Sequence, residues 1–141
     1  MENSKREIKF RAWDKTAEKM VDMTEDGFSF EIMAQGDIRL NHVKNNHRYF
    51  IMQFTGLKDK NGKEIYEGDI LQIKSKGNET TFGVLEDVVV EWDEQTAGFT
   101  ANFKEHNYIG WDEMMADHIG RVRVIGNIYE DKHLLLNNQE K

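Results

Sequence analysis

The sequence predicts a mainly β protein whose C-terminal part forms a small barrel or sandwich. Apolar and polar residues alternate along many short segments, which is the pattern of half-buried strands. These segments recur at roughly ten-residue spacing and are separated by glycine-containing turns, as in small all-β folds. From Gly68 onward, the order of turns, strands and one short helix matches the layout of a small SH3-like barrel. We therefore expect a short helix just before the last strand.

The N-terminal strands follow from local alternation. Residues 8–12 alternate apolar and polar side chains, and residues 19–23 are expected to form the return strand of a hairpin. A further strand is expected at 28–32, and a polar loop at 42–48. Residues 49–54 are apolar at nearly every position, which favours a strand covered on both faces.

Turn residues divide the C-terminal part. Residues 59–63, with the sequence DKNGK, are a strong turn signal because Asn-Gly tolerates positive φ. In a second turn, we expect Gly68 to adopt a backbone conformation that residues with a Cβ disfavour, and Asp69 to accept hydrogen bonds from nearby backbone N–H groups. The elements expected after it are strands at 70–74, at 82–92 with a bend near Glu86, at 99–103 and at 122–128, a short helix at 112–118 and a terminal helical turn at 131–136.

The expected core collects apolar residues that share one face of these strands. If the Trp92 ring is buried there, the substitution Trp92→Ala should cost roughly 3–5 kcal/mol of stability. The expected core residues are Phe54, Ile70 or Leu71, Val88, Val90, Trp92, Phe99, Val122, Val124 and Ile128.

Composition and charge exclude several classes of protein. The 141 residues include no cysteine, which excludes disulfides, cysteine nucleophiles and thiolate metal sites and fits a reducing cytoplasm. The N-terminus lacks the apolar segment of a signal peptide, and no apolar run is long enough to span a membrane. The net charge is −7, and residues 61–141, with 8 basic and 16 acidic side chains, carry −8. We therefore expect a cytoplasmic protein that binds neither membranes nor duplex DNA, whose phosphates the acidic part would repel.

The sequence contains no catalytic, cofactor-binding or metal-binding template. The glycines form neither G-x-G nor Gly-Lys-Ser/Thr, and no serine lies in G-x-S-x-G, so phosphate-binding loops and a hydrolase elbow are absent. A calcium loop around Gly62 would need ligands from Leu57 and Gly68, and the histidines lack metal-ligand spacing. We expect no enzymatic activity, no cofactor and no metal. A solvated face is preferred over a divalent-cation site for the acidic cluster of Glu86, Asp87, Glu91, Asp93 and Glu94.

Every tryptophan in the chain is followed by an aspartate, at Trp13, Trp92 and Trp111. The preferred interpretation is structural: the indole packs at the edge of the core where a strand ends, and the aspartate caps the next turn or helix. The alternative is that the aromatic–acid pair recognises a partner.

Four blocks of the sequence resemble the YopX family, which comprises small proteins encoded by bacteriophages and prophages, mostly of Gram-positive bacteria. The blocks are REIKFRAWD at 6–14, FTGLKDKNGKEIYEGDI at 54–70, VEWD at 90–93 and IGNIYE at 125–130. The resemblance implies a small N-terminal α+β portion at residues 1–54, followed by a C-terminal SH3-like β-barrel with one short helix at residues 55–141. It implies no particular biochemical activity.

The leading hypothesis is a non-enzymatic phage accessory protein that binds a macromolecule, from the host or the phage, or assembles with itself. One alternative is a nucleic-acid-associated protein that uses Trp13, the basic residues of the N-terminal strand and Arg121 with Arg123. Another is a metal-dependent enzyme that uses the acidic cluster. Self-association is expected through the apolar segment 20–32. The candidate interaction residues are Trp13, Asp14, Asp59, Asn61, Gly62, Tyr66, Gly68, Asp69, Trp92, Asp93, Asn127 and Tyr129.

Overall fold

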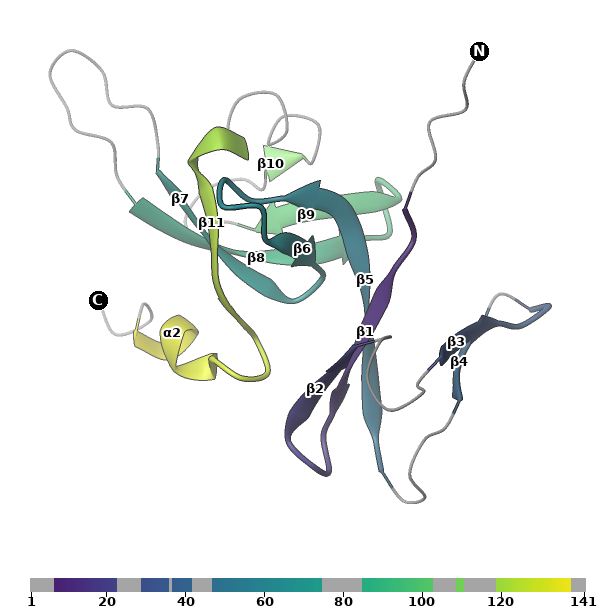
Figure 1. The fold of residues 1–141 in the computed structure, drawn as a ribbon. Helices are drawn as coiled ribbons and strands as arrows, with labels where there is room; N and C mark the ends of the chain where they lie inside the picture. Colours follow the sequence, from purple (N-terminus) through teal and green to yellow (C-terminus); the bar gives the residue numbers. More distant parts are fainter. Residues whose placement is uncertain are drawn as a thin grey trace, which may run out of the picture. The chain divides into compact units, whose positions relative to one another are not determined.

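The chain divides into two compact units, residues 1–54 and residues 55–141, drawn from a computed structural model in Figure 1. Both units are built mainly from antiparallel strands, which confirms the mainly β class. The structure describes residues 7–22, 29–35, 37–41, 47–74, 85–102, 109–110 and 119–137.

Unit 1 is organised around strand β1 (Phe10–Asp14). β1 pairs on one side with β2 (Lys19–Asp22) and on the other with the first part of β5 (Tyr49–Lys58), both antiparallel. β3 (Ser29–Ile32) and β4 (Ile38–Asn41) form a separate two-stranded antiparallel ribbon. The three N-terminal strands expected from alternation are therefore confirmed, with small shifts at their ends.

The alternation in β1 places Phe10 and Ala12 on one face, and both are buried. The ring of Phe30, from β3, lies with its centroid 5.3 Å from that of Phe10. A backbone hydrogen bond from the N–H of Met33 to the carbonyl oxygen of Asp37 closes the ribbon. The β3–β4 ribbon therefore supplies an aromatic side chain that packs against β1.

The expectation that residues 49–54 are covered on both faces is wrong at one position. Met52 and Phe54 are buried, but the side chain of Phe50 is 43% exposed. Phe50 pairs with Trp13 near the end of β1, and the ammonium group of Lys15 lies 5.9 Å from its ring centroid. The ring thus lies at the end of the strand pair, where β1 gives way to a solvated turn.

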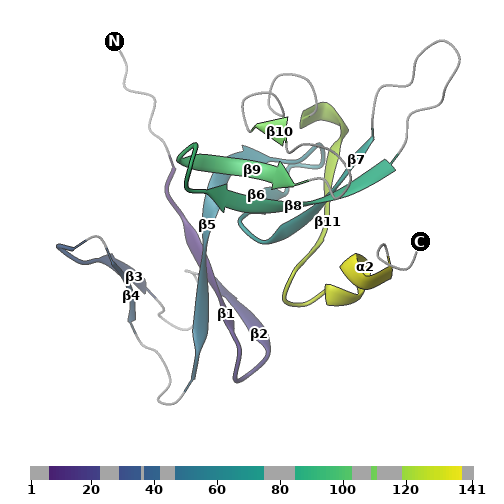
Figure 2. The ribbon, with the colours of Figure 1, turned by 180° about the vertical axis from the view of Figure 1, so that it is seen from behind.

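Unit 2 contains a five-stranded antiparallel sheet in the order β10-β9-β8-β7-β11, and β6, which neighbours β5 (Figures 1 and 2). The bounds are β6 (Glu64–Tyr66), β7 (Asp69–Lys74), β8 (Leu85–Asp93), β9 (Gly98–Asn102), β10 (Ile109–Gly110) and β11 (Val122–Asn127). A 3-10 helix, η1 (Ile119–Arg121), leads directly into β11, and helix α2 (Lys132–Asn137) follows it. The strands expected at 70–74 and 122–128 and the terminal helical turn are confirmed, whereas the helix expected at 112–118 lies outside the described residues.

The core of unit 2 forms on one face of the sheet. Ile65 of β6 belongs to this core, and Leu57 of β5 packs against it. Both Ile70 and Leu71 are fully buried, although they are adjacent in β7 and point to opposite faces. The buried cluster consists of Ile65, Leu71, Ile73, Val88, Val90, Phe99, Ala101, Val122 and Val124. Most of the expected core is therefore confirmed.

Three sequence-based expectations about unit 2 are wrong. Trp92 is 46% exposed rather than buried. β8 extends past the start of β7 at this residue, so Trp92 pairs with Phe99 of β9 and has no partner residue in β7. Ile128 is half-buried, since it follows the end of β11. Glu86 does not bend the strand, because its backbone pairs with Ile73 within the continuous β8.

Gly68 joins three segments of unit 2. Its φ is +80°, its N–H donates to the carbonyl oxygen of Val90, and its own carbonyl accepts from the N–H of Ile128. A residue with a Cβ would be strained at this φ. Asp69 accepts a hydrogen bond from the backbone N–H of Tyr66 at 2.8 Å. Both expectations for this turn are therefore confirmed.

A bulge in β11 brings Gly126 against the turn that follows it. The pairing with β7 shifts between Val124 and Gly126, and the carboxylate of Asp131 accepts a hydrogen bond from the N–H of Asn127. A Cβ added to Gly126 would lie 2.5 Å from Oδ2 and 2.9 Å from Cβ of Asp131. The space that a side chain would need at this glycine is thus already filled.

We predict that Gly126→Ala lowers the free energy of unfolding by about 1–3 kcal/mol, because the new methyl group displaces Asp131 and its hydrogen bond. Urea denaturation followed by circular dichroism measures the change. Gly120→Ala is the matched control, since a Cβ there meets nothing within 4 Å. Equal stability of the two variants would contradict the prediction.

Candidate functional site

The residues singled out from the sequence lie at turns and strand ends, where the carboxylates of the aspartates and the amide oxygen of Asn127 accept backbone hydrogen bonds. In unit 1 they form the hairpin that follows Trp13. In unit 2 they form the turn at 59–63, the turn around Gly68, the turn after β11 and the hairpin that follows Trp92. We describe each in turn, because what these side chains contact decides what chemistry they can perform.

The carboxylate of Asp59 is buried and accepts three backbone hydrogen bonds. Oδ1 accepts from the N–H groups of Asn61 at 2.8 Å and Lys63 at 2.9 Å, and Oδ2 accepts from the N–H of Val124 at 2.9 Å. Gly62 completes the turn with a φ of +83°. Asp59 therefore shapes its own turn and ties that turn to the bulged strand β11.

These contacts determine the charge of Asp59. Burial raises the pKa of this carboxyl, but the N–H groups of Val124, Lys63 and Asn61 and the positive charge of Lys63 together hold the pKa below its usual value of 3.8. The side chain is thus an anion whose two oxygens serve the fold.

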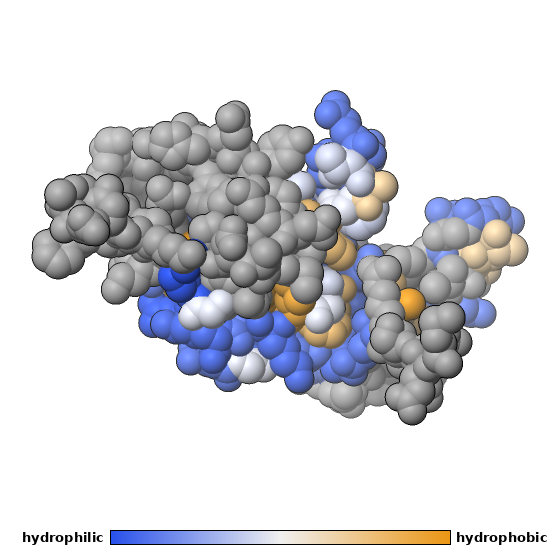
Figure 3. Space-filling model, turned by 90° about the horizontal axis from the view of Figure 1, so that it is seen from above, coloured by the Kyte–Doolittle hydropathy of each residue, from blue (hydrophilic) through white to orange (hydrophobic). Residues whose placement is uncertain are grey.

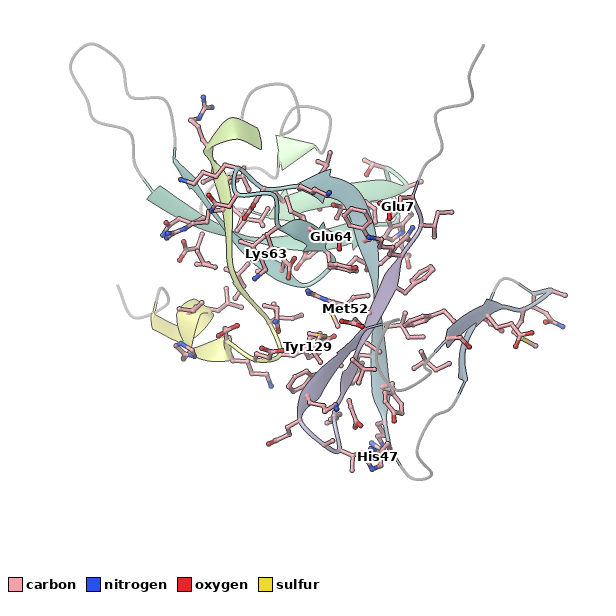
Figure 4. All side chains as sticks on the ribbon, in the orientation of Figure 1. Glu7, His47, Met52, Lys63, Glu64 and Tyr129 are labelled. Atoms are coloured by element: carbon pink, nitrogen blue, oxygen red, sulfur yellow. The ribbon has the colours of Figure 1, made fainter. Side chains whose placement is uncertain are left out.

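The turn after β11 is built in the same manner. Oδ1 of Asn127 accepts hydrogen bonds from the N–H groups of Tyr129 at 3.0 Å and Glu130 at 2.9 Å, the pattern of an Asx turn. Asn127 is buried, and Tyr129, labelled in Figure 4, is half-buried. The side chain of Asn127 thus stabilises the turn after β11, and that of Asp69 stabilises the turn around Gly68.

The two Trp-Asp pairs that the structure describes begin the same kind of hairpin, one in each unit. Trp13 pairs with Met20 across β1 and β2, and Trp92 pairs with Phe99 across β8 and β9. In each hairpin Oδ1 of the aspartate accepts the N–H two residues later, at 3.0 Å. The fourth turn residue has a φ of +53° in both, at Glu18 and at Ala97. The capping role predicted for Asp14 and Asp93 is confirmed, and Trp111 lies outside the described residues.

The two hairpins differ in the surroundings of the tryptophan and the aspartate. The side chain of Trp13 is 9% exposed, against 46% for Trp92. Asp14 is buried and Oδ2 lies 2.7 Å from Nδ1 of His47, whereas Asp93 is partly exposed and its Oδ2 accepts from the hydroxyl of Thr96. The indole of Trp13 is thus buried, whereas that of Trp92 packs on the core residue Phe99 and stays about half-exposed.

His47, labelled in Figure 4, is a residue that sequence reasoning missed. It precedes β5, and 33 positions separate it from Asp14, so the pairing of β1 with β5 brings the two together. Burial raises the pKa of Asp14, while the N–H of Ala17, the contact with His47 and the N–H of Thr16 lower it, and the net pKa lies below 3.8. No local signal in the sequence marks this pair.

Among the described residues, no group of three or more histidine, aspartate and glutamate side chains is arranged to hold a metal ion. Asp87 and Glu91 lie on the face of β8 opposite to Val88 and Val90, and Asp93 binds its own turn. Within the described ranges there is also no helix long and apolar enough to cross a membrane.

Comparisons with known proteins agree with this fold. A family model described as YopX protein matches residues 9–136. The structure of protein EF1440 from Enterococcus faecalis is 26% identical, with a TM-score of 0.59, over 93% of this chain and 99% of that one. The structure of protein yopX from Bacillus subtilis is 21% identical, with a TM-score of 0.59, over 90% of this chain and 95% of that one. No curated protein matches the chain.

We predict that Asp59→Asn lowers the free energy of unfolding at neutral pH by about 1–3 kcal/mol, because an amide NH₂ would face a backbone N–H donor. Since the folded pKa lies below the unfolded one, the ionised carboxylate stabilises the fold above about pH 4 and loses this effect as the pH falls through the folded pKa.

The difference between wild type and Asp59→Asn should therefore shrink in acid, as measured by urea denaturation from about pH 7 to pH 3. Glu94→Gln, which removes an exposed carboxylate from a turn, controls for loss of charge alone. A difference that stays constant over this range would show that ionisation of Asp59 does not support the fold.

Proposed function

The chain belongs to the YopX family, and from this premise we propose that it is a phage or prophage accessory protein that acts by binding, to a macromolecule or to itself, rather than by catalysis. One observation carries the proposal. The buried polar side chains that the sequence marks most strongly, Asp14, Asp59, Asp69 and Asn127, accept backbone hydrogen bonds that shape turns. Since these side chains serve the fold, we assign function to the exposed side chains of the described residues rather than to their buried carboxylates.

Within this proposal, unit 2 is an SH3-like barrel, a fold commonly used for binding. Three features support this. Strands β7 to β10 pair in chain order, the last strand β11 returns beside β7, and the 3-10 helix η1 immediately precedes β11. The α+β character of residues 1–54 stays a prediction, since the described elements there are strands.

The surface offers few large apolar side chains for a partner. Among the described residues these are Ile8, Phe50 and Trp92. In the view of Figure 3, most described residues are hydrophilic and hydrophobic areas are small. Binding through aromatic side chains within a polar surface is therefore the mode that these residues support.

A nucleic-acid-associated role is the second candidate, and one observation favours it. Phe50 is exposed beside the ammonium group of Lys15, and an aromatic ring next to a cation can stack a single-stranded base. Trp13, which this hypothesis also used, is buried. Arg123 is exposed but donates a hydrogen bond to Gln72 at 2.8 Å.

We predict weak or no binding of duplex DNA at physiological salt, because the charge of −8 on residues 61–141 repels phosphates. Fluorescence anisotropy with a labelled duplex and a labelled single strand, repeated at several salt concentrations, measures this. Sub-micromolar affinity for the duplex at physiological salt would favour the second candidate over the first. Binding of the single strand that Phe50→Leu removes would locate it at the Phe50 ring.

We also predict self-association at micromolar concentration, as expected for the segment 20–32, because sheet edges favour assembly of identical copies. Within this segment Val21 is buried and the ring of Phe30 packs against Phe10, and residues 23–28 lie outside the described residues. Multi-angle light scattering should give a mass above the 16.6 kDa of one chain, falling on dilution. A mass of one chain at every concentration would contradict self-association, and the proposed binding would then be to another macromolecule.

A further inference from the structure

The indole of Trp92 is held in place although it is exposed. Its ring packs edge-on against Phe99, with the centroids 5.2 Å apart and an interplanar angle of 80°. Phe99 is itself buried in the core of unit 2. The following turn is fixed by Asp93, which accepts from the N–H of Gln95 and from the hydroxyl of Thr96. A ring supported in this way loses little conformational freedom when it binds a ligand.

The charged residues of the hairpin that carries Trp92 are all of one sign. Residues 85–102, which form the β8–β9 hairpin, contain five aspartates and glutamates and no lysine, arginine or histidine, a net charge of −5. Glu91 and Glu94 are exposed. Glu91 is the strand neighbour of Trp92, so its side chain points to the opposite face from the indole. Its negative charge would therefore attract a cation at the indole over a distance, within the screening length of about 8 Å, rather than by direct contact.

The equivalent hairpin of unit 1 shows that this charge is not needed for the fold. Residues 10–22 contain three basic and three acidic side chains, a net charge of 0, and build the same turn. There the tryptophan is buried, with Lys15 and Lys19 exposed at the turn. Exposure of the indole and a strongly negative charge therefore occur together in the second hairpin and are both absent from the first.

We propose that the Trp92 end of the β8–β9 hairpin is a docking site for a lysine- or arginine-rich segment of a protein partner, one of whose cationic side chains stacks on the indole. This inference rests on the proposed function, because it names the site and the partner chemistry of a binding protein. An aromatic face attracts a cation within about 6 Å, and tryptophan does so best. The surrounding carboxylates raise the local concentration of a basic segment and disfavour phosphates and acidic peptides.

A second copy of the chain is a poorer occupant. Each copy carries a net charge of −7 and presents the same acidic hairpin. Charge complementarity thus favours a basic partner over self-association at this particular site.

The test uses the full chain with ¹⁵N-labelled tryptophan and a short peptide of alternating arginine and serine as the probe. The indole N–H signal of Trp92, assigned with Trp92→Phe, should shift in a saturable manner, while that of Trp13 stays in place. A peptide of the same length with alternating glutamate and serine is the control with reversed charge. Equal shifts with both peptides, or none with the arginine peptide, would overturn the proposal.

Variants separate a cation–π contact from a general apolar one. Trp92→Leu should weaken binding of the arginine peptide by about fivefold to tenfold, whereas Trp92→Phe, which keeps an aromatic face, should lose less. Phe50→Leu, at the other exposed aromatic ring among the described residues, should leave the affinity unchanged. Glu91→Gln combined with Glu94→Gln should weaken binding mainly at low salt. Wild-type affinity in Trp92→Leu, with near-ultraviolet circular dichroism confirming its fold, would contradict the site.

The failure of this inference can be told apart from failure of the proposed function. If the arginine peptide does not bind but the chain binds another macromolecule or itself, the site is wrong and the binding function stands. If the chain neither binds nor assembles, the proposed function fails as well. If Trp92→Leu dissociates an assembly seen by light scattering, the occupant of the site is a second copy, and the proposal for a basic partner is overturned.

Discussion

The buried carboxylate of Asp59 is the interaction on which unit 2 depends most. It joins the turn that opens the unit to Val124 in the last strand, across 65 positions of sequence. A buried anion is tolerated only when its oxygens are satisfied, so this side chain requires the turn at 59–63 and the bulge of β11 to form together. Gly68 adds a second tie, to Val90 in β8 and to Ile128, which follows the C-terminal end of β11.

Much of this arrangement could be predicted from local sequence. The Asn61-Gly62 turn, the unusual conformation of Gly68 and the capping by Asp69 follow from residue types that favour one backbone geometry. The partners of Asp14 and Asp59 could not be predicted, because His47 and Val124 come into place only through strand pairing. Trp92 illustrates a different limit. The alternation in β8 correctly gives its face, but no local pattern shows that β7 begins too late to cover it.

Among the described residues, the same Trp-Asp hairpin occurs in both units, and comparing the two shows which of its features the turn requires. Both Trp-Asp hairpins keep the aspartate cap and the left-handed fourth turn residue, so these belong to the turn itself. In unit 1 the aspartate also contacts His47 and the indole is buried. In unit 2 the indole stays accessible on a support of Phe99. The same short motif can therefore bury its indole in one unit and leave it accessible in the other.

The long-range ties to β11 also bear on how unit 2 folds. Lys60, Asp59 and Gly68 each bond to residues of β11 or of the turn after it, so these contacts close long loops of chain. The entropy of such closure is lost before the contacts compensate for it, which slows folding and makes it cooperative. In a nascent chain that has not yet reached Val124, Asp59 lacks one of its three donors, and the carbonyl oxygen of Gly68 lacks its donor, the N–H of Ile128. The native contacts of Asp59, Lys60 and Gly68 in unit 2 can thus be completed only after β11 and the turn that follows it have been synthesised.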